Sequence, residues 1–547
     1  MPLPDTATFA NRPTLSAFAL NALVATYLMA LCNATFWGHL FRIFDGRTVT
    51  ALVFAGAVWA LMLLVISLLA VRKLQKPVLV ALLITAGVTS YYVDVLGVVV
   101  DRDMIQNAMT TTFAESKHLI TVHFLGHVAL YGVLPALLVL WVRVRRAAVG
   151  RALVGYGLVT ALSAALLVGL LFTNLKAYST VLRADKELMG SVQPLAPMGG
   201  ALRYAKMMFK STQIVVQPTG RDAGTGPYLA KADKPVLMVI VAGETGRAQN
   251  WSLGGYGRDT NPELAKRDIV YYPNATSCGT ATATSLPCMF SPLTRDQYSY
   301  EGGLGNENLL DVLMHAGFEV EWWENNTGDK NVGDRLPVRP RVMTAADGAE
   351  FCFPECIDGV FLKSLQEKAD TITENTVIVL HQIGSHGPSY WLRYPADREI
   401  FSPACKTPEL TDCSTDEIVN AYDNTIAYTD WFLAQVIDVL DASDRVIPAM
   451  YYVSDHGESL GEGGLYLHGT PYFMAPEYQT RVPMVIWMSE RFRDSLSVDA
   501  DCLKAAAAQP VSHDNMFSTV LGMVDVTTTA KDDALDLAGS CRQVTTG

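Results

Sequence analysis

The sequence predicts a chain in two parts: a membrane domain with five transmembrane helices, then an extracytoplasmic α/β domain with a largely parallel sheet. Five apolar runs of about 20 residues each lie within residues 1–172. From Lys234 on, short buried-strand patterns alternate with helical patterns, which is typical of a parallel sheet covered on both faces. Eight of the nine cysteines follow residue 275, which indicates an oxidising compartment.

Length and charge support the division into two parts. The chain has 547 residues, too many for one ordinary domain, and a net charge of −12. Residues 1–230 carry 19 Lys and Arg against 9 Asp and Glu, whereas the remainder carries 23 against 45. A slightly basic, apolar first part is therefore joined to a strongly acidic second part.

The predicted spans occupy most of the first part. The first of them is not expected to be a cleaved signal peptide, because the region before it is weakly basic and four more spans follow. The spans are placed at Leu15–Trp37, Val49–Val71, Val78–Val100, Val122–Val142 and Leu153–Phe172.

Loop charge predicts the orientation of these spans. Residues 71–77, after the second span, hold three positive side chains, and residues 143–151, after the fourth, hold four. Short loops rich in Lys and Arg stay in the cytoplasm. The N-terminus is then cytoplasmic, and everything after the fifth span lies outside the inner membrane.

We expect three regions: a transmembrane domain over residues 1–173, a periplasmic linker over 174–230, and a periplasmic domain over 231–547. In the linker, residues 199–211 carry basic side chains at helical spacing among apolar ones. This pattern suits a helix on anionic headgroups, or equally an amphipathic helix packed on the soluble domain. Residues 218–227 are rich in Gly and predict a flexible connection.

The cysteines of the second part fall in close pairs, which in an oxidising compartment indicate loop-closing disulfides. A zinc–cysteine site at Cys352 and Cys356 is disfavoured, because no second matched pair accompanies it. The pairs are Cys278 with Cys288, Cys352 with Cys356, Cys405 with Cys413, and the remaining Cys502 with Cys541.

Polar side chains gather where three predicted strands end. The carboxyl ends of parallel strands meet at one sheet edge, where carboxylates and imidazoles would together form a divalent metal site. Each residue alone is more often a turn residue or a satisfied imidazole, so the prediction rests on the set. The set is Glu244 after the first strand, His381 and His386 at the second, Asp455 and His456 after the third, and His468 beyond it.

The stretch SCGTATATSLPCMFS, residues 277–291, places three threonines on alternate positions between two cysteines. Gly279 and Pro287 make it poor for an interior strand, so we predict a disulfide-closed loop. Coordination by Zn²⁺ lowers the pKa of a hydroxyl and makes it a nucleophile. The residues alone do not select among Thr280, Thr282 and Thr284, and the alternative is a surface turn without chemistry.

Four blocks, residues 243–262, 277–291, 381–390 and 454–469, resemble the signature blocks of the lipid A phosphoethanolamine transferases, which include the mobile colistin-resistance enzymes. The resemblance extends over essentially the whole chain. It implies five spans and an α/β/α periplasmic domain of the alkaline phosphatase/sulfatase type.

The resemblance also implies roles for the strand-end residues. Thr282 is the expected nucleophile and, with Glu244, Asp455 and His456, a ligand of one tightly bound Zn²⁺; a second Zn²⁺ is allowed during turnover. The transferred phosphate is expected between two histidines, and His381 is interpreted as structural. The two phosphate-lining histidines are His386 and His468.

Substrate contacts are implied in two segments. In the second part, Asn326, Thr327 and Lys330 match the family's substrate loop. After the third span, three polar residues at i, i+4 and i+8 would form one stripe on a helix, and the family uses matching positions for the phosphoethanolamine head group. The alternative is a solvated helix face. These three residues are Asn107, Thr111 and Glu115.

The implied function is transfer of phosphoethanolamine from phosphatidylethanolamine to a lipid A phosphate through a threonine adduct, which confers polymyxin resistance. Cys352–Cys356 and Cys405–Cys413 match family disulfides in position. The expected partners are the donor lipid, lipid A and other inner-membrane lipids; we expect a monomer and no nucleic acid.

Three alternatives stay open from the sequence. The same chemistry could serve another acceptor, such as an inner-core sugar, a glucan or a protein. Water could be the acceptor, which would make the chain a membrane-anchored phosphodiesterase or sulfatase-like hydrolase. The third alternative is a metal-stabilised membrane scaffold without activity.

Overall fold

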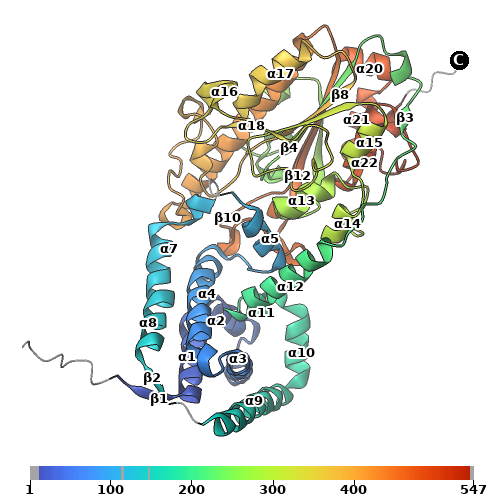
Figure 1. Cartoon of the computed structure of the whole chain (residues 1–547). Coiled ribbons are helices and arrows are strands. Elements are labelled where there is room, and N and C mark those ends of the chain that lie inside the picture. Colours follow the sequence, from blue (N-terminus) through green and yellow to red (C-terminus); the bar gives the residue numbers. More distant parts are fainter. Residues whose placement is uncertain (1–11, 113–115, 146–147, 543–547) are drawn as a thin grey trace, which may run out of the picture. The chain divides into compact units, whose positions relative to one another are not determined.

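The computed structural model describes residues 12–112, 116–145 and 148–542 (Figure 1). They form two compact units. The first contains the described residues up to Ile105 together with Ile120–Arg203, and the second contains Gln106–Leu119 and the described residues from Tyr204 on. A short segment between two predicted spans therefore belongs to the second unit.

The first unit contains helices long and apolar enough to cross a membrane. Four stretches in the described residues meet this criterion, and a bent helix pair, α1 (Ala17–Leu31) with α2 (Ala34–Ile43), makes a fifth span if counted as one. The five predicted spans are thereby confirmed. The four single spans are Thr48–Leu69, Arg72–Leu96, Val122–Trp141 and Val149–Phe172. The first is helix α3 and the last is helix α9. The second consists of the turn η1 (Arg72–Leu74) and α4 (Gln75–Leu96), and the third of α7 (Val122–His127), η3 (Val128–Val133) and α8 (Leu134–Trp141).

The first predicted span is not one straight helix, because α1 and α2 meet at an angle of 68°. The buried side chain of Asn33 occupies the break. Its Nδ2 donates to the carbonyls of Leu28 (2.8 Å) and Gln193 (2.9 Å), and its Oδ1 accepts from the Gln193 backbone N–H (2.6 Å). An amide that captures backbone groups competes with the helical hydrogen bonds and ends the helix there.

Shorter elements complete the first unit and lead out of it. Strand β1 (Thr14–Ser16) pairs in parallel with β2 (Arg143–Arg145), and two helices, α10 (Leu175–Ala184) and α11 (Lys186–Gly190), follow α9. The basic helix predicted in the linker is present as α12 (Leu195–Ser211).

The second unit is built on an eight-stranded sheet in the order β13-β5-β12-β9-β4-β8-β6-β7. Strand β4 pairs in parallel with β8 and β9, whereas β12 runs antiparallel to both of its neighbours. The strands are β4 (Val236–Gly243), β5 (Ile269–Thr276), β6 (Glu319–Glu324), β7 (Arg341–Val342), β8 (Thr376–His381), β9 (Ile447–Ser454), β12 (Arg481–Met488) and β13 (Val511–Ser512).

Helices cover both faces of this sheet, and every residue of β4 and β9 is buried. Figure 1 shows α17 (Phe361–Ala369) and α18 (Thr415–Ala442) on one side and α15 (Leu309–His315) and α22 (Asp514–Met523) on the other. Strands buried on both faces become continuous apolar runs. The predicted α/β/α architecture is confirmed.

The prediction of a flexible connection over residues 218–227 is wrong. The Thr219 N–H donates to Glu307 at 2.9 Å, and strand β3 (Gly224–Thr225) pairs with β14 (Val526–Thr527). The glycines in this stretch suggested flexibility, but Gly224 forms part of a short strand pair. This stretch is consequently fixed to the second unit.

Four disulfides form in the second unit, and they are the pairs that spacing suggested. The ninth cysteine, Cys32, is a buried free thiol in the first unit. The disulfides are Cys278–Cys288, Cys352–Cys356, Cys405–Cys413 and Cys502–Cys541.

Candidate active site

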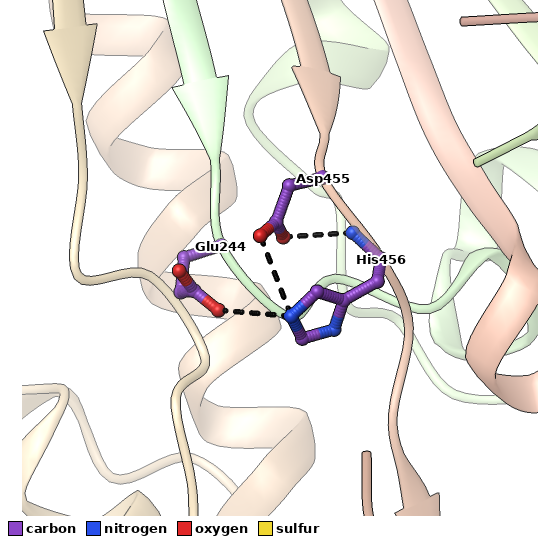
Figure 2. Close-up of side chains that lie close together, drawn as sticks. All are labelled: Glu244, Asp455 and His456. Carbon is purple, nitrogen blue, oxygen red and sulfur yellow. Dashed lines mark hydrogen bonds and ion pairs between the residues drawn. The ribbon is translucent and has the colours of Figure 1, made fainter. Parts of the chain in front are cut away.

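Three predicted metal ligands converge at the carboxyl edge of the sheet. Glu244 directly follows β4, and Asp455 and His456 directly follow its parallel neighbour β9 (Figure 2). His456 Nε2 lies 3.4 Å from Glu244 Oε1 and 3.3 Å from Asp455 Oδ2. One donor atom from each residue lies within 4.8 Å of the other two.

Thr282 completes this group. Its Oγ1 lies 3.1 Å from Glu244 Oε2 and 3.3 Å from His456 Nε2, and the residue is buried. Thr280 instead donates its hydroxyl hydrogen to the Thr470 carbonyl. The structure therefore brings the second threonine, and not the first, to the strand ends.

The threonine stretch is not a loop throughout, because helix α13 (Thr282–Met289) begins at Thr282. Pro287 lies inside this short helix and has no N–H to donate to the carbonyl four residues earlier. That carbonyl, of Ala283, accepts from Gln106 Nε2 at 3.3 Å instead. A partner distant in sequence thus supports a helix where the sequence predicted a loop.

His513 holds the start of this stretch and was missed in the sequence. Its Nδ1 accepts from the Cys278 N–H (3.0 Å), and its Nε2 donates to the Ser454 carbonyl (2.9 Å). It thus connects the segment before Thr282 to the residue before Asp455. Acceptance of the Cys278 N–H requires a ring nitrogen without a hydrogen, hence the neutral ring, and burial lowers the pKa of His513 to about 4. The two-residue strand before it, β13, is too short to be recognised from sequence.

The two buried carboxylates at the site, Glu244 and Asp455, favour binding of a cation. The ion pairs of Glu244 and Asp455 in the structure both go to His456, and Asp455 Oδ2 is buried without a hydrogen bond. Burial raises the pKa of Asp455 to about 6, and the Glu244 carboxylate adds to the increase. Two buried carboxylates side by side are costly unless opposite charge compensates them.

The imidazole of His456 is oriented as a ligand. Its Nδ1 lies 2.9 Å from the Gly457 carbonyl and donates a hydrogen to it, so Nε2 is the nitrogen that faces the two carboxylates and is available to a metal. One nitrogen and carboxylate and hydroxyl oxygens are donors that Zn²⁺ accepts. The residues present therefore fit a divalent transition metal.

His386 and His468 lie beside this group. The His468 ring centroid is 4.4 Å from that of His456 and 5.3 Å from that of His386. His468 Nδ1 lies 2.8 Å from Glu458 Oε2, and Tyr390 donates to Glu458 Oε1 at 2.6 Å. This buried carboxylate, which the sequence analysis did not single out, fixes the orientation of the His468 ring.

The predicted substrate loop contributes one clear contact. Asn326 Nδ2 donates to Glu244 Oε2 at 2.7 Å and lies 3.1 Å from His381 Nε2, so it positions a carboxylate of the site. Lys330 Nζ donates to the carbonyls of Thr327 (2.7 Å) and Thr110 (3.1 Å). The Lys330 ammonium thus connects this loop to the segment 106–119.

The predicted stripe does not lie on one continuous helix, because helix α5 (Arg102–Thr110) ends before Thr111. Asn107 lies in the helix, and Thr111 lies just past its end with its hydroxyl donating to the Asn107 carbonyl at 2.7 Å. β-Branched threonines with hydroxyls bonded to the backbone disfavour continuation of a helix. Glu115 lies outside the described residues.

A second carboxylate, Glu355, fixes the far end of the segment. Glu355 Oε1 pairs with Lys117 Nζ (2.8 Å) and His118 Nε2 (3.0 Å), and Glu355 Oε2 pairs with Arg393 (2.7 Å). Arg393 also donates to the His386 carbonyl at 2.9 Å. Burial would raise the pKa of Glu355, but these basic partners outweigh it and hold the pKa far below its usual range.

Two family profiles match the chain. The sulfatase profile matches residues 237–526, which is the sheet unit that carries the site. The profile described as phosphoethanolamine transferase EptA/EptB matches residues 58–209.

Individual proteins match over nearly the full length. Phosphoethanolamine transferase EptA of Escherichia coli strain K12 is 37% identical over 98% of both chains. Phosphatidylethanolamine transferase Mcr-1 of Escherichia coli is 37% identical over 94% of this chain and 96% of its own. The structure of the integral membrane lipooligosaccharide phosphoethanolamine transferase A from Neisseria meningitidis superposes with a TM-score of 0.93 at 34% identity, covering 97% of this chain and 100% of that one. The chain belongs to the phosphoethanolamine transferase family.

Proposed function

We propose that this protein transfers phosphoethanolamine from phosphatidylethanolamine to a phosphate of lipid A at the periplasmic face of the bacterial inner membrane. The observation that supports this proposal most directly is the position of Thr282. Its hydroxyl lies within 3.3 Å of both Glu244 and His456 where buried strands end. The names of its relatives, EptA and Mcr-1, support this chemistry.

The reaction has two displacement steps. Thr282 gives up its hydroxyl proton, for which Glu244 Oε2 at 3.1 Å is an acceptor. Its Oγ1 then forms a bond to phosphorus while the bond from phosphorus to the diacylglycerol oxygen breaks, which leaves phosphoethanolamine on the threonine. An oxygen of the acceptor phosphate then attacks phosphorus, and the threonine oxygen leaves. Two inversions give overall retention at phosphorus.

The residues that would hold the metal, which we propose is Zn²⁺, are Glu244, Thr282, Asp455 and His456. Bound there, Zn²⁺ supplies the positive charge that lowers the pKa of the threonine hydroxyl and offsets the phosphoryl charge. Asn326 holds the Glu244 carboxylate in place at 2.7 Å.

The leaving groups need protons, and we assign this task to His386 and His468. Glu458 fixes His468 through Nδ1, so Nε2 is the nitrogen that serves the reacting oxygen. Asn107, Thr111 and Lys330, together with Thr327 and Glu115, are proposed to bind the phosphoethanolamine head group. The hydrogen bond from Lys330 to the Thr110 carbonyl supports a shared site for the two segments.

The acceptor decides the biological effect. An added ethanolamine ammonium cancels one anionic charge on lipid A, which weakens the attraction of cationic peptides such as polymyxins. A second acceptor class is an inner-core sugar, because relatives 27% and 26% identical over 93% of the chain are named Kdo(2)-lipid A phosphoethanolamine 7''-transferase.

We further propose a cytoplasmic N-terminus, a monomer, and the domain limits 1–173, 174–230 and 231–547. The loop charges of the first unit support the orientation.

Mass spectrometry of lipid A from cells that express the chain tests the proposal. We expect a phosphoethanolamine adduct on a phosphate with the wild type and none with Thr282→Ala. Thr284→Ala, two residues along the same helix, is the matched control and should retain modification. Modification by Thr282→Ala, or an adduct on a sugar hydroxyl alone, would refute the nucleophile or the acceptor respectively.

A further inference from the structure

We propose that a basic pocket in the first unit binds the phosphate group of an anionic phospholipid from the cytoplasmic leaflet. The pocket has a volume of about 130 Å³, whereas one water needs about 10–15 Å³ by the same measure. Three arginines line it: Arg72, Arg145 and Arg151. This site is separate from the proposed transfer site and does not depend on it.

The three arginines come from different elements. Arg72 lies in η1, Arg145 in β2 and Arg151 in α9. Within residues 12–112, 116–145 and 148–542, none of the three forms an ion pair with a carboxylate. Guanidinium groups bind phosphate in bidentate fashion, so three around one cavity favour a phosphate ligand with net negative charge.

The backbone at the pocket is held in a costly conformation. Arg72 has a φ of +39°, which is rare for a residue with a side chain. Its N–H donates to the Tyr156 hydroxyl at 2.9 Å, and the Tyr156 ring packs edge-on against Phe18 at 5.3 Å. Gly155 makes room, because a Cβ there would lie 2.9 Å from the Phe18 ring. Strain held by specific contacts is typical of binding sites.

The chain path places the pocket at the cytoplasmic face. Arg72 is the first residue of the span that contains α4, Arg145 precedes α9, and Arg151 lies in the first turn of α9. Span α4 begins beside the pocket and at its other end leads to the segment 106–119 of the second, periplasmic unit. The two ends of a span lie on opposite membrane faces, so the pocket faces the cytoplasm.

The rest of the lining identifies the ligand as a lipid rather than a free anion. Phe18, Val144 and Ala152 give the pocket an apolar wall that suits a glycerol and the start of an acyl chain. A zwitterionic head group carries its own ammonium, which three arginines repel. Phosphatidylglycerol is therefore the favoured probe, and phosphatidylethanolamine the disfavoured one.

Native mass spectrometry of the full-length chain with equimolar phosphatidylglycerol and phosphatidylethanolamine tests the site. We expect retained phosphatidylglycerol adducts, and at least about a tenfold loss in the variant Arg72→Gln/Arg145→Gln/Arg151→Gln, because this variant lacks the three basic groups that attract the phosphate. The control is Arg42→Gln/Arg47→Gln, two exposed arginines of the same unit outside the pocket lining. Equal loss in both variants, or equal retention of the two lipids, would overturn the proposal.

Two further experiments, a competition with phosphate and a photolabelling, test whether the ligand is a lipid and where it binds. Displacement of the bound lipid by millimolar inorganic phosphate would show a general anion site and overturn the assignment to a lipid. If the triple variant fails to fold, a photoreactive phosphatidylglycerol on the wild-type chain gives the answer. Labelled peptides from residues 14–18 or 143–156 are expected, and labels confined to other peptides would contradict the site.

Discussion

Thr282 is one of three threonines on alternate positions, and its neighbours distinguish it from the other two. His513 joins the backbone before it to the backbone before Asp455, with bonds of 3.0 Å and 2.9 Å. Glu244 and His456 flank its hydroxyl. As the proposed nucleophile, a hydroxyl held this way needs little reorganisation to react.

His513→Gln should reduce the rate of transfer, because an amide cannot reproduce both bonds of the neutral ring. The pKa of His513 is about 4 in the fold and 6.5 unfolded. Because the pKa is lower in the folded protein, the neutral ring contributes to the free energy of unfolding above pH 6.5. Up to about 3 kcal/mol of this free energy is lost as the pH falls through 4.

Thermal unfolding of both proteins at pH 7 and pH 4.5 measures this effect. The wild type should lose more stability on acidification than His513→Gln. An identical loss in the two proteins would contradict the assigned protonation state.

Removal of the proposed metal should destabilise the protein, because two buried carboxylates would then share the single imidazole of His456 as their ion-pair partner. Chelation should lower the midpoint of thermal unfolding, and added Zn²⁺ should restore it. A ligand at 1,000 times its Kd adds about 4 kcal/mol to the free energy of unfolding. Asp455→Asn, with one carboxylate neutralised, should respond less to the chelator. An unchanged midpoint in the chelated wild type would exclude a bound metal.

At the scale of elements, the segment 106–119 stands out because three contacts fix it to the second unit. Gln106 bonds to helix α13, the Thr110 carbonyl accepts from Lys330, and the Glu355 carboxylate pairs with Lys117 and His118. The Cys352–Cys356 disulfide closes the loop that presents Glu355. Proposed head-group residues are thereby carried to the strand ends.

Glu355→Gln should weaken this attachment and raise the KM for the lipid donor about tenfold, since a charge-assisted hydrogen bond contributes about 1.5–3 kcal/mol. Lys117→Met removes only the ion pair of Lys117 with Glu355 and should also raise the KM for the lipid donor. Glu350→Gln, an exposed glutamate five residues earlier, is the matched control. Steady-state kinetics with a fluorescent phosphatidylethanolamine measures all three; a changed kcat with constant KM would contradict a positioning role.

At the scale of the whole molecule, the proposed orientation places the two basic loops of the first unit in the cytoplasm. Green fluorescent protein fused after Lys73 should fluoresce, because it folds in the cytoplasm, and a fusion after Asn107 should not. Alkaline phosphatase fusions at the same positions serve as the reciprocal control. Fluorescence of the fusion after Asn107 would reverse the orientation.

Sequence patterns predicted the features that depend on periodicity. The spans and the central strands are long apolar runs, and Glu244, Asp455 and His456 could be found because they directly follow such strands. The bend at Asn33, the helix at Thr282 and the roles of His513 and Glu355 could not be found. Each depends on a partner more than 100 residues away, such as Gln193 for Asn33 and Gln106 for Ala283.

The most direct test is to map the phosphoethanolamine group on the protein during turnover. Rapid acid quench of the full-length enzyme with phosphatidylethanolamine and no acceptor should leave the group on the peptide that contains Thr282, with release of one equivalent of diacylglycerol. The Thr282→Ala variant should show neither. An adduct on any other residue, or transfer to lipid A without an adduct, would contradict the account.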